Sequence, residues 1–371
     1  MSVPLPRAEP TPRQTAAVRL WLWGMAALVF AMIIVGGATR LTDSGLSITE
    51  WQPLLGAIPP LHEADWHAAF EKYRQIPQYH QVNKGMSLAE FQFIYWWEWA
   101  HRFLGRFIGV AFALPLLFFW ACGYLRKGMP LKLSGILLLG GLQGGIGWYM
   151  VMSGLVDRID VSQYRLALHL TVAMLILALI AWIAFDLKRE PGKADPPLRT
   201  ATSGQKTLAL GVLGLILLQT VLGGFVAGLN AGLTYNTWPL MDGHFIPNGL
   251  GTLQPWYLNL FENITMVQFN HRMMAYVICA LVLVQAAWIA RTADDDRLTR
   301  SAMVLMAAVL VQAGLGIWTL LAVVPLSLGL AHQGWAAIVL ILTVRHAHLM
   351  TRAPRAVEAL SPGYSAKPSM S

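Results

Sequence analysis

Ionisable side chains interrupt an apolar run near residues 91–122, where a membrane-spanning helix is expected to contain none. The run holds Glu98, His101 and Arg102. Placing such groups in hydrocarbon costs about 3 kcal/mol each even on the mildest scales, so they usually carry function. Glu98 and His101 share one face of a helix because they are three positions apart. An imidazole can bind a metal, and a neighbouring carboxyl group can transfer protons.

Three further histidines occupy apolar runs of their own, namely His169, His271 and His332. All four histidines lie at a similar depth, about 9–15 Å below the membrane surface that carries the long loops, at 1.5 Å per residue. A bis-imidazole heme needs one histidine on each of two helices at matched depth. We therefore predict that His101 pairs with His169 and that His271 pairs with His332, each pair holding one heme iron.

Two other interpretations of these histidines stay open. An intramembrane histidine can form a hydrogen bond between helices, and zinc is less favoured because no cysteine pair lies near them at ligand spacing. Small residues one turn after each histidine leave room for a porphyrin, although they also serve helix packing. These candidate cofactor-binding positions are Gly105, Ala173, Ala275 and Ala336.

Four arginines are candidate partners for the heme propionates, because a guanidinium fork matches a carboxylate. Arg102 and Arg272 directly follow histidines, whereas Arg40 and Arg165 lie at the loop ends of their apolar runs. Snorkelling to the interface is the alternative for the first two. For Arg102 an ion pair with Glu98, four positions earlier, is equally open.

The composition is that of a polytopic membrane protein, with 56% hydrophobic and 12% charged residues among 371. Soluble domains carry roughly twice that charged fraction. A membrane-spanning helix needs roughly 20 apolar residues, and eight segments satisfy this length. They lie near 19–39, 91–122, 131–153, 162–185, 206–228, 264–290, 299–322 and 326–347. We predict an all-α protein that crosses the membrane eight times.

Basic residues follow the expected topology rather than a nucleic-acid site, although the net charge is +8. They gather at the termini and in alternate connections, whereas the loop 229–263 contains no Lys or Arg. The positive-inside rule then makes both termini cytoplasmic and turns the long loops, 41–90 and 229–263, outward. The first apolar run is full length and no transit-peptide pattern precedes it, which favours a bacterial inner membrane.

The chain contains an internal repeat. Gly36, Trp51 and Pro60 recur 187 positions later as Gly223, Trp238 and Pro247, and the histidine pairs recur at offsets of 170 and 163. Such self-similarity indicates two copies of one unit, here two pseudo-symmetric four-helix bundles. The predicted units are an N-terminal tail 1–18, a bundle 19–187, a linker 188–205, a bundle 206–348 and a tail 349–371.

The two copies differ beside their histidines. Glu98 of the first copy corresponds to Gln268 of the second, so only the first copy carries a carboxyl group there. We interpret Glu98 as a group that accepts or delivers protons. The alternative is a supporting hydrogen bond to the imidazole or to Arg102. In the first long loop, the spacing of Trp66, Phe70 and Tyr73 predicts an amphipathic helix that lies on the membrane or caps the first bundle.

The run Glu98-Trp-Ala-His-Arg102, the segment Leu41–Trp51 and the duplicated four-span plan resemble the heme A synthase family. The resemblance implies an enzyme of cytochrome oxidase biogenesis that oxidises the C8 methyl group of heme O to a formyl group. Two successive hydroxylations through an alcohol, with oxygen from water, are implied. The resemblance also implies that His101 and His169 bind heme O beside an essential Glu98. It further implies that His271 and His332 bind a heme b. The cysteine pair of some bacterial members is missing from the first long loop, so a thiol-based step does not transfer.

Partners implied by the resemblance are the heme O-forming farnesyltransferase and cytochrome oxidase assembly, besides membrane lipid and a possible second copy of the chain. Two other functions stay open. One is a bis-histidine diheme cytochrome that transfers electrons from quinol, which stacked hemes spanning the membrane would favour. The other is a heme transporter or chaperone, in which the repeat would serve alternating access. The transporter does not require the difference between Glu98 and Gln268, and the cytochrome is less favoured because all four histidines lie in the same half of the membrane.

Overall fold

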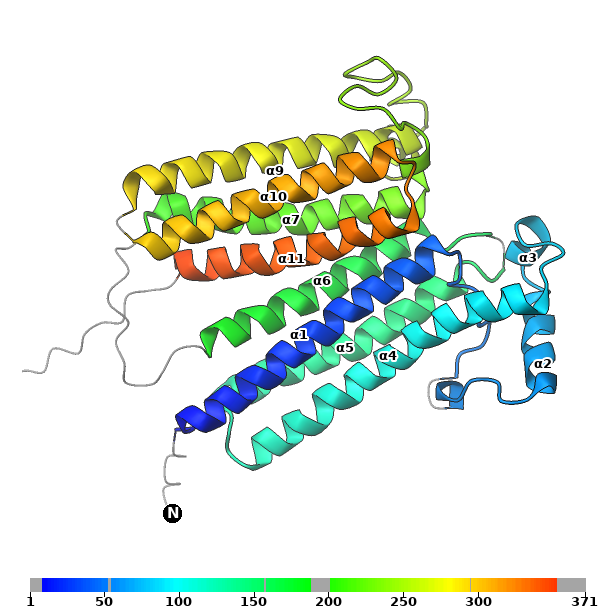
Figure 1. Ribbon diagram of the computed structural model, residues 1–371, viewed down its shortest axis with the longest axis horizontal. Coiled ribbons are helices and arrows are strands. Elements are labelled where there is room, and N and C mark those ends of the chain that lie inside the picture. Colours follow the sequence, from blue (N-terminus) through cyan, green and yellow to red (C-terminus); the bar gives the residue numbers. More distant parts are fainter. Residues whose placement is uncertain (1–8, 53–54, 157, 188–200, 294, 352–371) are drawn as a thin grey trace, which may run out of the picture.

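The computed structural model describes residues 9–52, 55–156, 158–187, 201–293 and 295–351. Eight helices of this described part are long and apolar enough to cross a membrane, which confirms the predicted number. They are α1 (Pro12–Leu41), α4 (Leu88–Ala121), α5 (Met129–Met152), α6 (Gln163–Asp186), α7 (Ser203–Gly228), α9 (Ile264–Thr292), α10 (Asp296–Leu321) and α11 (Leu326–Thr351). In Figure 1, α7, α9, α10 and α11 lie side by side, and α1, α4, α5 and α6 lie beside them at an incline. No strand occurs among the described residues, consistent with the predicted all-α class.

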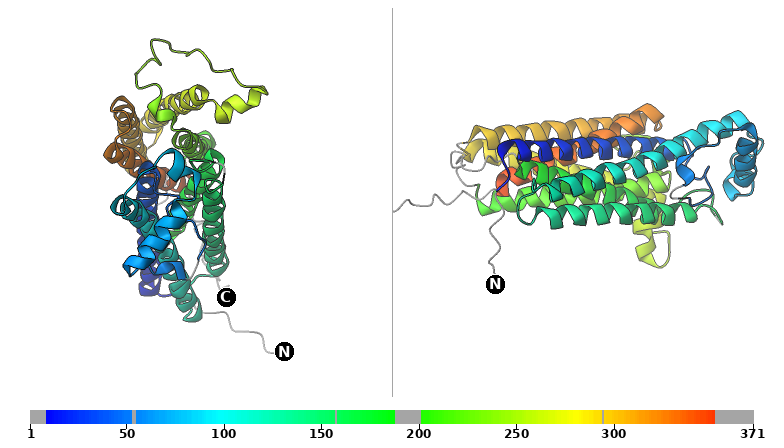
Figure 2. Two further views of the ribbon diagram at one scale, coloured as in Figure 1. Left: turned by 90° about the vertical axis from the view of Figure 1, so that its right-hand side faces the viewer. Right: turned by 90° about the horizontal axis from the view of Figure 1, so that it is seen from below.

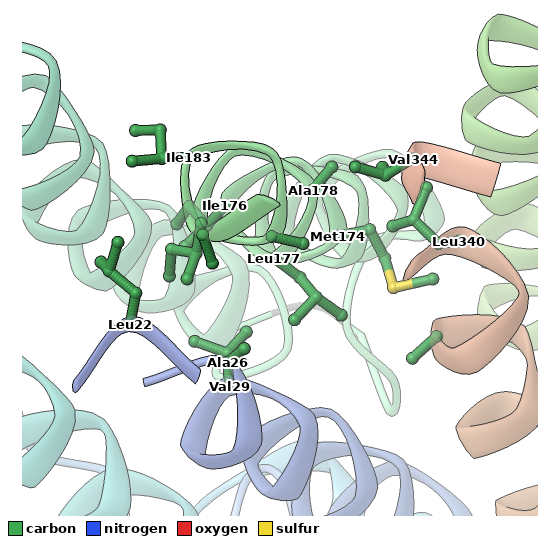
Figure 3. Packing of buried hydrophobic residues seen from close by; sticks show 14 of the residues in the cluster. Leu22, Ala26, Val29, Met174, Ile176, Leu177, Ala178, Ile183, Leu340 and Val344 are labelled. Atoms are coloured by element: carbon green, nitrogen blue, oxygen red, sulfur yellow. The ribbon is translucent and has the colours of Figure 1, made fainter. Parts of the chain in front are cut away.

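The helices contact one another in two groups of four. α1, α4, α5 and α6 form one closed ring of contacts, and α7, α9, α10 and α11 form another. The groups meet because α6 packs against α7 and α11, while α1 packs against α11. Figure 3 shows this junction, where side chains of α1, α6 and α11 such as Val29, Leu177 and Leu340 interdigitate. A single buried apolar core therefore joins the two rings.

Several helices begin earlier than hydropathy predicts, and α1 and α4 show the physical reason. α1 starts at Pro12 rather than near residue 19, because Thr11 and Gln14 cap its first turn reciprocally. α4 starts at Leu88, where Ser87 and Glu90 form the same kind of cap. Polar capping residues lower the local hydropathy without ending the helix. The predicted linker 188–205 and tail 349–371 lie mostly outside the described residues.

Both long loops lie at the same end of the helices, which we call the loop end. The first holds α2 (Glu63–Tyr73) and α3 (Pro77–Gln81) beside a projecting part of α4, and the second reaches sideways (Figures 1 and 2). α2 contains the predicted apolar face of Trp66, Phe70 and Tyr73, and this face docks on α4, with the Phe70 ring stacked 4.9 Å from that of Phe91. Of the two expectations for this helix, packing against the first ring is the one observed. The second loop contains η2 (Ala231–Leu233), η3 (Trp256–Leu258) and α8 (Asn259–Glu262).

Two glycines bring α6 and α7 into close contact. A Cβ atom on Gly224 would lie 2.7 Å from Ala167 Cα, and one on Gly228 would lie 2.6 Å from Gln163 Cα. The spacing of these glycines is the small-xxx-small pattern that lets helix backbones approach in membranes. Close packing of the two rings therefore requires that positions 224 and 228 carry no side chain.

Replacing Gly224 with leucine is expected to destabilise the fold by about 1–3 kcal/mol, because the new side chain overpacks the α6–α7 contact. Thermal unfolding in detergent, followed by tryptophan fluorescence, measures the effect. Gly211→Leu on the same helix is the matched control, since nothing lies within 4 Å of the corresponding Cβ position. Equal melting temperatures for the two variants would show that the contact contributes nothing.

Candidate heme-binding site

The first predicted histidine pair meets inside the first ring of helices. His101 of α4 and His169 of α6 have ring centroids 6.4 Å apart. Two imidazoles on opposite sides of one metal have centroids about 6 Å apart, given metal–nitrogen bonds of about 2 Å each. The separation of this pair therefore suits axial ligation of one iron atom.

Each of the four histidine rings faces a glycine of a neighbouring helix. A Cβ atom on Gly36 or Gly147 would lie 3.2 or 3.0 Å from the rings of His101 and His169, respectively. The same holds in the second ring of helices at distances of 3.3 and 2.8 Å, for Gly223 beside His271 and Gly316 beside His332. These glycines let each imidazole ring lie directly against the neighbouring helix, at a position where a Cβ atom would crowd the ring.

The four facing glycines are functional candidates that the sequence analysis did not identify, because it considered only the helices that carry the histidines. Their signal was present in the repeat, because Gly36 and Gly223 are 187 positions apart and Gly147 and Gly316 are 169 apart. The predicted small residues have different surroundings. Gly105 accommodates Met32, whose Cε would lie 3.3 Å from a Cβ atom there. Ala173 and Ala336 pack against the main apolar core, and Ala275 is half-buried.

Glu98 lies in a dense set of hydrogen bonds at the loop end of α4. Its side chain is only 2% exposed, and its carboxylate accepts hydrogen bonds from Ser47 Oγ and from the Ile48 N–H, both at 2.7 Å. Arg102 donates to the same carboxylate from Nε at 3.0 Å and from a terminal nitrogen at 2.6 Å. The predicted ion pair between Glu98 and Arg102 is therefore present.

Arg102 also holds the first long loop. Its terminal nitrogens donate to the backbone carbonyls of Ile48 at 2.6 Å and Glu50 at 2.9 Å. Together with Glu98 it fastens loop residues 47–50 onto α4, one turn from His101. The carboxyl group of Glu98 is consequently fixed in position beside the first histidine pair and is paired with the Arg102 guanidinium.

Gln268 and Arg272 make equivalent contacts in the second ring of helices. Arg272 donates to the backbone carbonyls of Tyr235 at 2.7 Å and Thr237 at 2.9 Å, which lie 187 positions after Ile48 and Glu50. Gln268 donates to the Ala231 carbonyl at 2.9 Å and accepts from Arg272 at 3.3 Å. A neutral amide thus performs the same fastening as Glu98, so holding the loop does not require a carboxylate.

The other two candidate arginines lie near the loop-end surface. Arg40 binds Asp43 at 3.0 Å and Asp160 at 3.5 Å, and it donates to the Ala227 carbonyl across the junction of the two rings. Burial raises the pKa of the Asp43 carboxyl group despite the adjacent Arg40. Arg165, one turn before His169, stacks on the ring of Tyr149 with its guanidinium carbon 3.6 Å from the centroid.

A metal site of another kind finds no support in the described part of the chain. No group of three or more His, Cys, Asp or Glu residues with metal-binding geometry occurs there. Cys122 and Cys279 are both free. The paired imidazoles and their facing glycines fit a heme, which supplies four equatorial nitrogens and leaves two positions for protein ligands.

The comparisons with known proteins agree with this geometry. Residues 19–344 match the family model described as "Cytochrome oxidase assembly protein". The chain is 52% identical over 334 residues to a heme A synthase of Brucella ovis, which covers 90% of this chain and 92% of the relative. It is 53% identical over 329 residues to a heme A synthase of Chelativorans sp., covering 89% and 90%. The chain belongs to the heme A synthase family.

Membership in the heme A synthase family confirms the resemblance carried by residues 98–102 and 41–51. It also agrees with a membrane-embedded oxidoreductase that handles heme during oxidase assembly. The half-buried histidines, the glycines that face them and the loop fastened to α4 are the features of this family member that can bind and orient a heme.

Gly147→Val is expected to reduce the heme content of this heme A synthase family member, because the new methyl groups would occupy the space beside the His169 ring. Heme per chain, measured as the pyridine hemochrome of the purified protein, tests the expectation. Gly144→Val, also on α5, is the control, since nothing lies within 4 Å of its Cβ position and the residue is exposed. An unchanged heme content in the Gly147 variant would mean that this glycine does not border the heme.

Proposed function

We propose that this protein is a heme A synthase that oxidises the C8 methyl group of heme O to a formyl group. The observation that carries the proposal is the half-buried pair His101–His169, whose ring centroids lie 6.4 Å apart, in a chain 52% identical to a heme A synthase over 90% of its length. Each hydroxylation breaks one C–H bond of the methyl carbon and forms a C–O bond with oxygen from water; two electrons leave, together with one proton from the carbon and one from the water. The resulting geminal diol loses water to give the formyl group, and an external acceptor takes the electrons.

The two histidine pairs divide this work in the proposal. His101 and His169 hold the substrate heme O, whereas His271 and His332 hold a resident heme b. Heme iron bound by two imidazoles supplies one-electron redox chemistry. The protein orients both groups through the facing glycines. Each ring of four helices then corresponds to one pseudo-symmetric copy of the repeat, with the boundaries predicted from the sequence.

Glu98 is the proton-handling group of the proposal. Its carboxyl group is fixed one turn from His101 by Ser47, Ile48 and Arg102, so it can stabilise positive charge that develops at the methyl carbon. A carboxylate at this place can also accept a proton as water attacks. The neutral Gln268 beside the second pair supports this assignment, because the loop is fastened there without a charge.

The propionates find several candidate partners among the arginines. Arg40 and Arg272 each have a buried Nε–H without an acceptor among the described residues, which favours them over the fully engaged Arg102. Arg165 lies one turn from His169 on the same helical face, so its guanidinium can reach that edge of the substrate.

We further propose a bacterial inner-membrane location with both termini in the cytoplasm and the loop end outside. The heme O-forming farnesyltransferase is the proposed supplier of substrate, and the oxidase is the proposed recipient of product. A second copy of this chain is a further proposed partner.

Expression in a host that makes heme O but not heme A tests the function directly. Chromatography of the extracted hemes is expected to show heme A, with a smaller amount of the C8 alcohol. Bound hemes without heme A or its alcohol would favour the diheme cytochrome. Binding and release of heme O without any oxidation would favour the transporter.

A further inference from the structure

Three of the four histidines share a neighbour that the heme-binding proposal does not use. One turn before the glycine that faces the ring, the adjacent helix carries a glutamine in three cases: Gln143 before Gly147, Gln219 before Gly223 and Gln312 before Gly316. The pattern Gln-x-x-x-Gly thus recurs beside His169, His271 and His332.

Each glutamine reaches the histidine across the helix interface. Gln143, Gln219 and Gln312 donate from Nε2 to the backbone carbonyls of their histidines at 2.9, 3.0 and 3.1 Å. Gln312 Nε2 also lies 3.2 Å from His332 Nδ1, and Gln219 Nε2 lies 3.4 Å from His271 Nε2. Two of the three amides, those of Gln219 and Gln312, are therefore within hydrogen-bond range of the imidazole as well as of the backbone.

Unused hydrogen-bonding capacity remains on both sides of these contacts. The Oε1 atoms of the three glutamines are buried and have no partner among the described residues. The same is true of Nδ1 of His169 and of His271. Buried polar atoms of this kind are costly, so an acceptor on the glutamine and a donor on the histidine that it already contacts indicate a hydrogen bond that forms in another state.

His101 is the exception. The residue one turn before its facing Gly36 is Met32, which occupies the repeat position of Gln219, 187 positions later. A thioether cannot donate and accepts only weakly. The ligand without an amide neighbour therefore belongs to the pair proposed to hold the substrate.

We propose that the three glutamines are positioning residues that accept the Nδ1–H of the iron-bound imidazoles, and that Met32 makes His101 the ligand from which heme is released. An imidazole bound through Nε2 keeps its proton on Nδ1, and a partner there fixes the ring and makes it a better ligand. Loss of such a partner typically costs 10–100-fold in affinity. A resident heme on His271 and His332 then stays bound, while product leaves from His101. The inference rests on the proposed division of substrate and resident hemes.

Exchanging Met32 and Gln219 between the two copies of the repeat tests the inference. Purified protein is mixed with excess apomyoglobin, and heme transfer is followed by absorption. We expect two phases, of which Met32→Gln slows the fast one at least about tenfold and Gln219→Met accelerates the slow one about 10–100-fold. Met32→Leu, which adds no amide, is the control and is expected to leave both phases unchanged.

The midpoint potential of the resident heme gives a readout that loss of packing alone would not produce. Gln219→Met is expected to raise this potential, because a less basic imidazole stabilises ferric iron less. Gln219→Glu, with a stronger acceptor, is expected to lower it. A tenfold change in the relative affinity for the two oxidation states corresponds to about 59 mV.

The outcomes separate the two proposals. Wild-type protein that holds no heme would overturn the proposed function and this inference with it. Bound hemes whose transfer rates and potentials are the same in all variants would overturn the inference and leave the proposed function standing.

Discussion

Replacing Glu98 with glutamine is expected to slow the conversion of heme O by about 100-fold or more, the usual contribution of a positioned acid or base. The variant removes the charge and proton affinity of the side chain but retains its hydrogen-bonding shape. Gln268 shows that a glutamine can fasten the loop to the helix beside an arginine, so the fold and both hemes are expected to remain. Heme A formed per minute, normalised to bound heme, measures the effect.

Gln268→Glu is the matched control for this variant, because it introduces the same chemical change, in reverse, at the corresponding place in the second copy. It is expected to leave conversion within a few-fold of wild type. Conversion at the normal rate in the Glu98→Gln variant would contradict a catalytic role. Glu98 would then act with Arg102 only to hold residues 47–50.

Replacing His271 with alanine is expected to abolish conversion and to remove one of the two hemes from each chain. The reaction needs a group that accepts electrons from the substrate. Without one of its two histidine ligands, the resident heme is expected to be lost or weakly bound. Heme content and heme A production measured on the same preparation test both parts. The His67→Ala variant is the control, because that loop side chain is 59% exposed and distant in sequence from the helices that carry the four histidines.

Wild-type activity in the His271 variant would mean that the second pair is not required for the reaction. A variant that keeps both hemes but loses activity would instead assign His271 to a function other than iron ligation. Melting temperature is followed alongside, so that a folding defect is recognised as such.

The features predicted most securely from the sequence are those that depend on local pattern. The eight helices follow from apolar length, and α2 follows from the spacing of Phe70 and Tyr73. The depth of His101 and His169 in their runs was enough to bring them to the same level, where the structure places them 6.4 Å apart.

Contacts between distant segments could not be predicted in the same way. Hydropathy does not specify which helix faces a histidine, so Gly36 and Gly147 were recognised as repeat positions but not as neighbours of the imidazoles. The competing interpretations of Arg102 also depended on the path of the loop. Because residues 48 and 50 fold back over α4, their carbonyls bind this guanidinium together with Glu98.

The central claim is that each pair of histidines ligates the iron of one heme, one imidazole on either side. Low-temperature electron paramagnetic resonance of the oxidised, purified protein measures this ligation most directly. The account predicts low-spin ferric signals typical of two imidazole ligands, equivalent to two hemes per chain when both sites are filled. Protein purified without heme after heme-replete growth, or high-spin signals that are indifferent to replacement of His101 and His332, would contradict it.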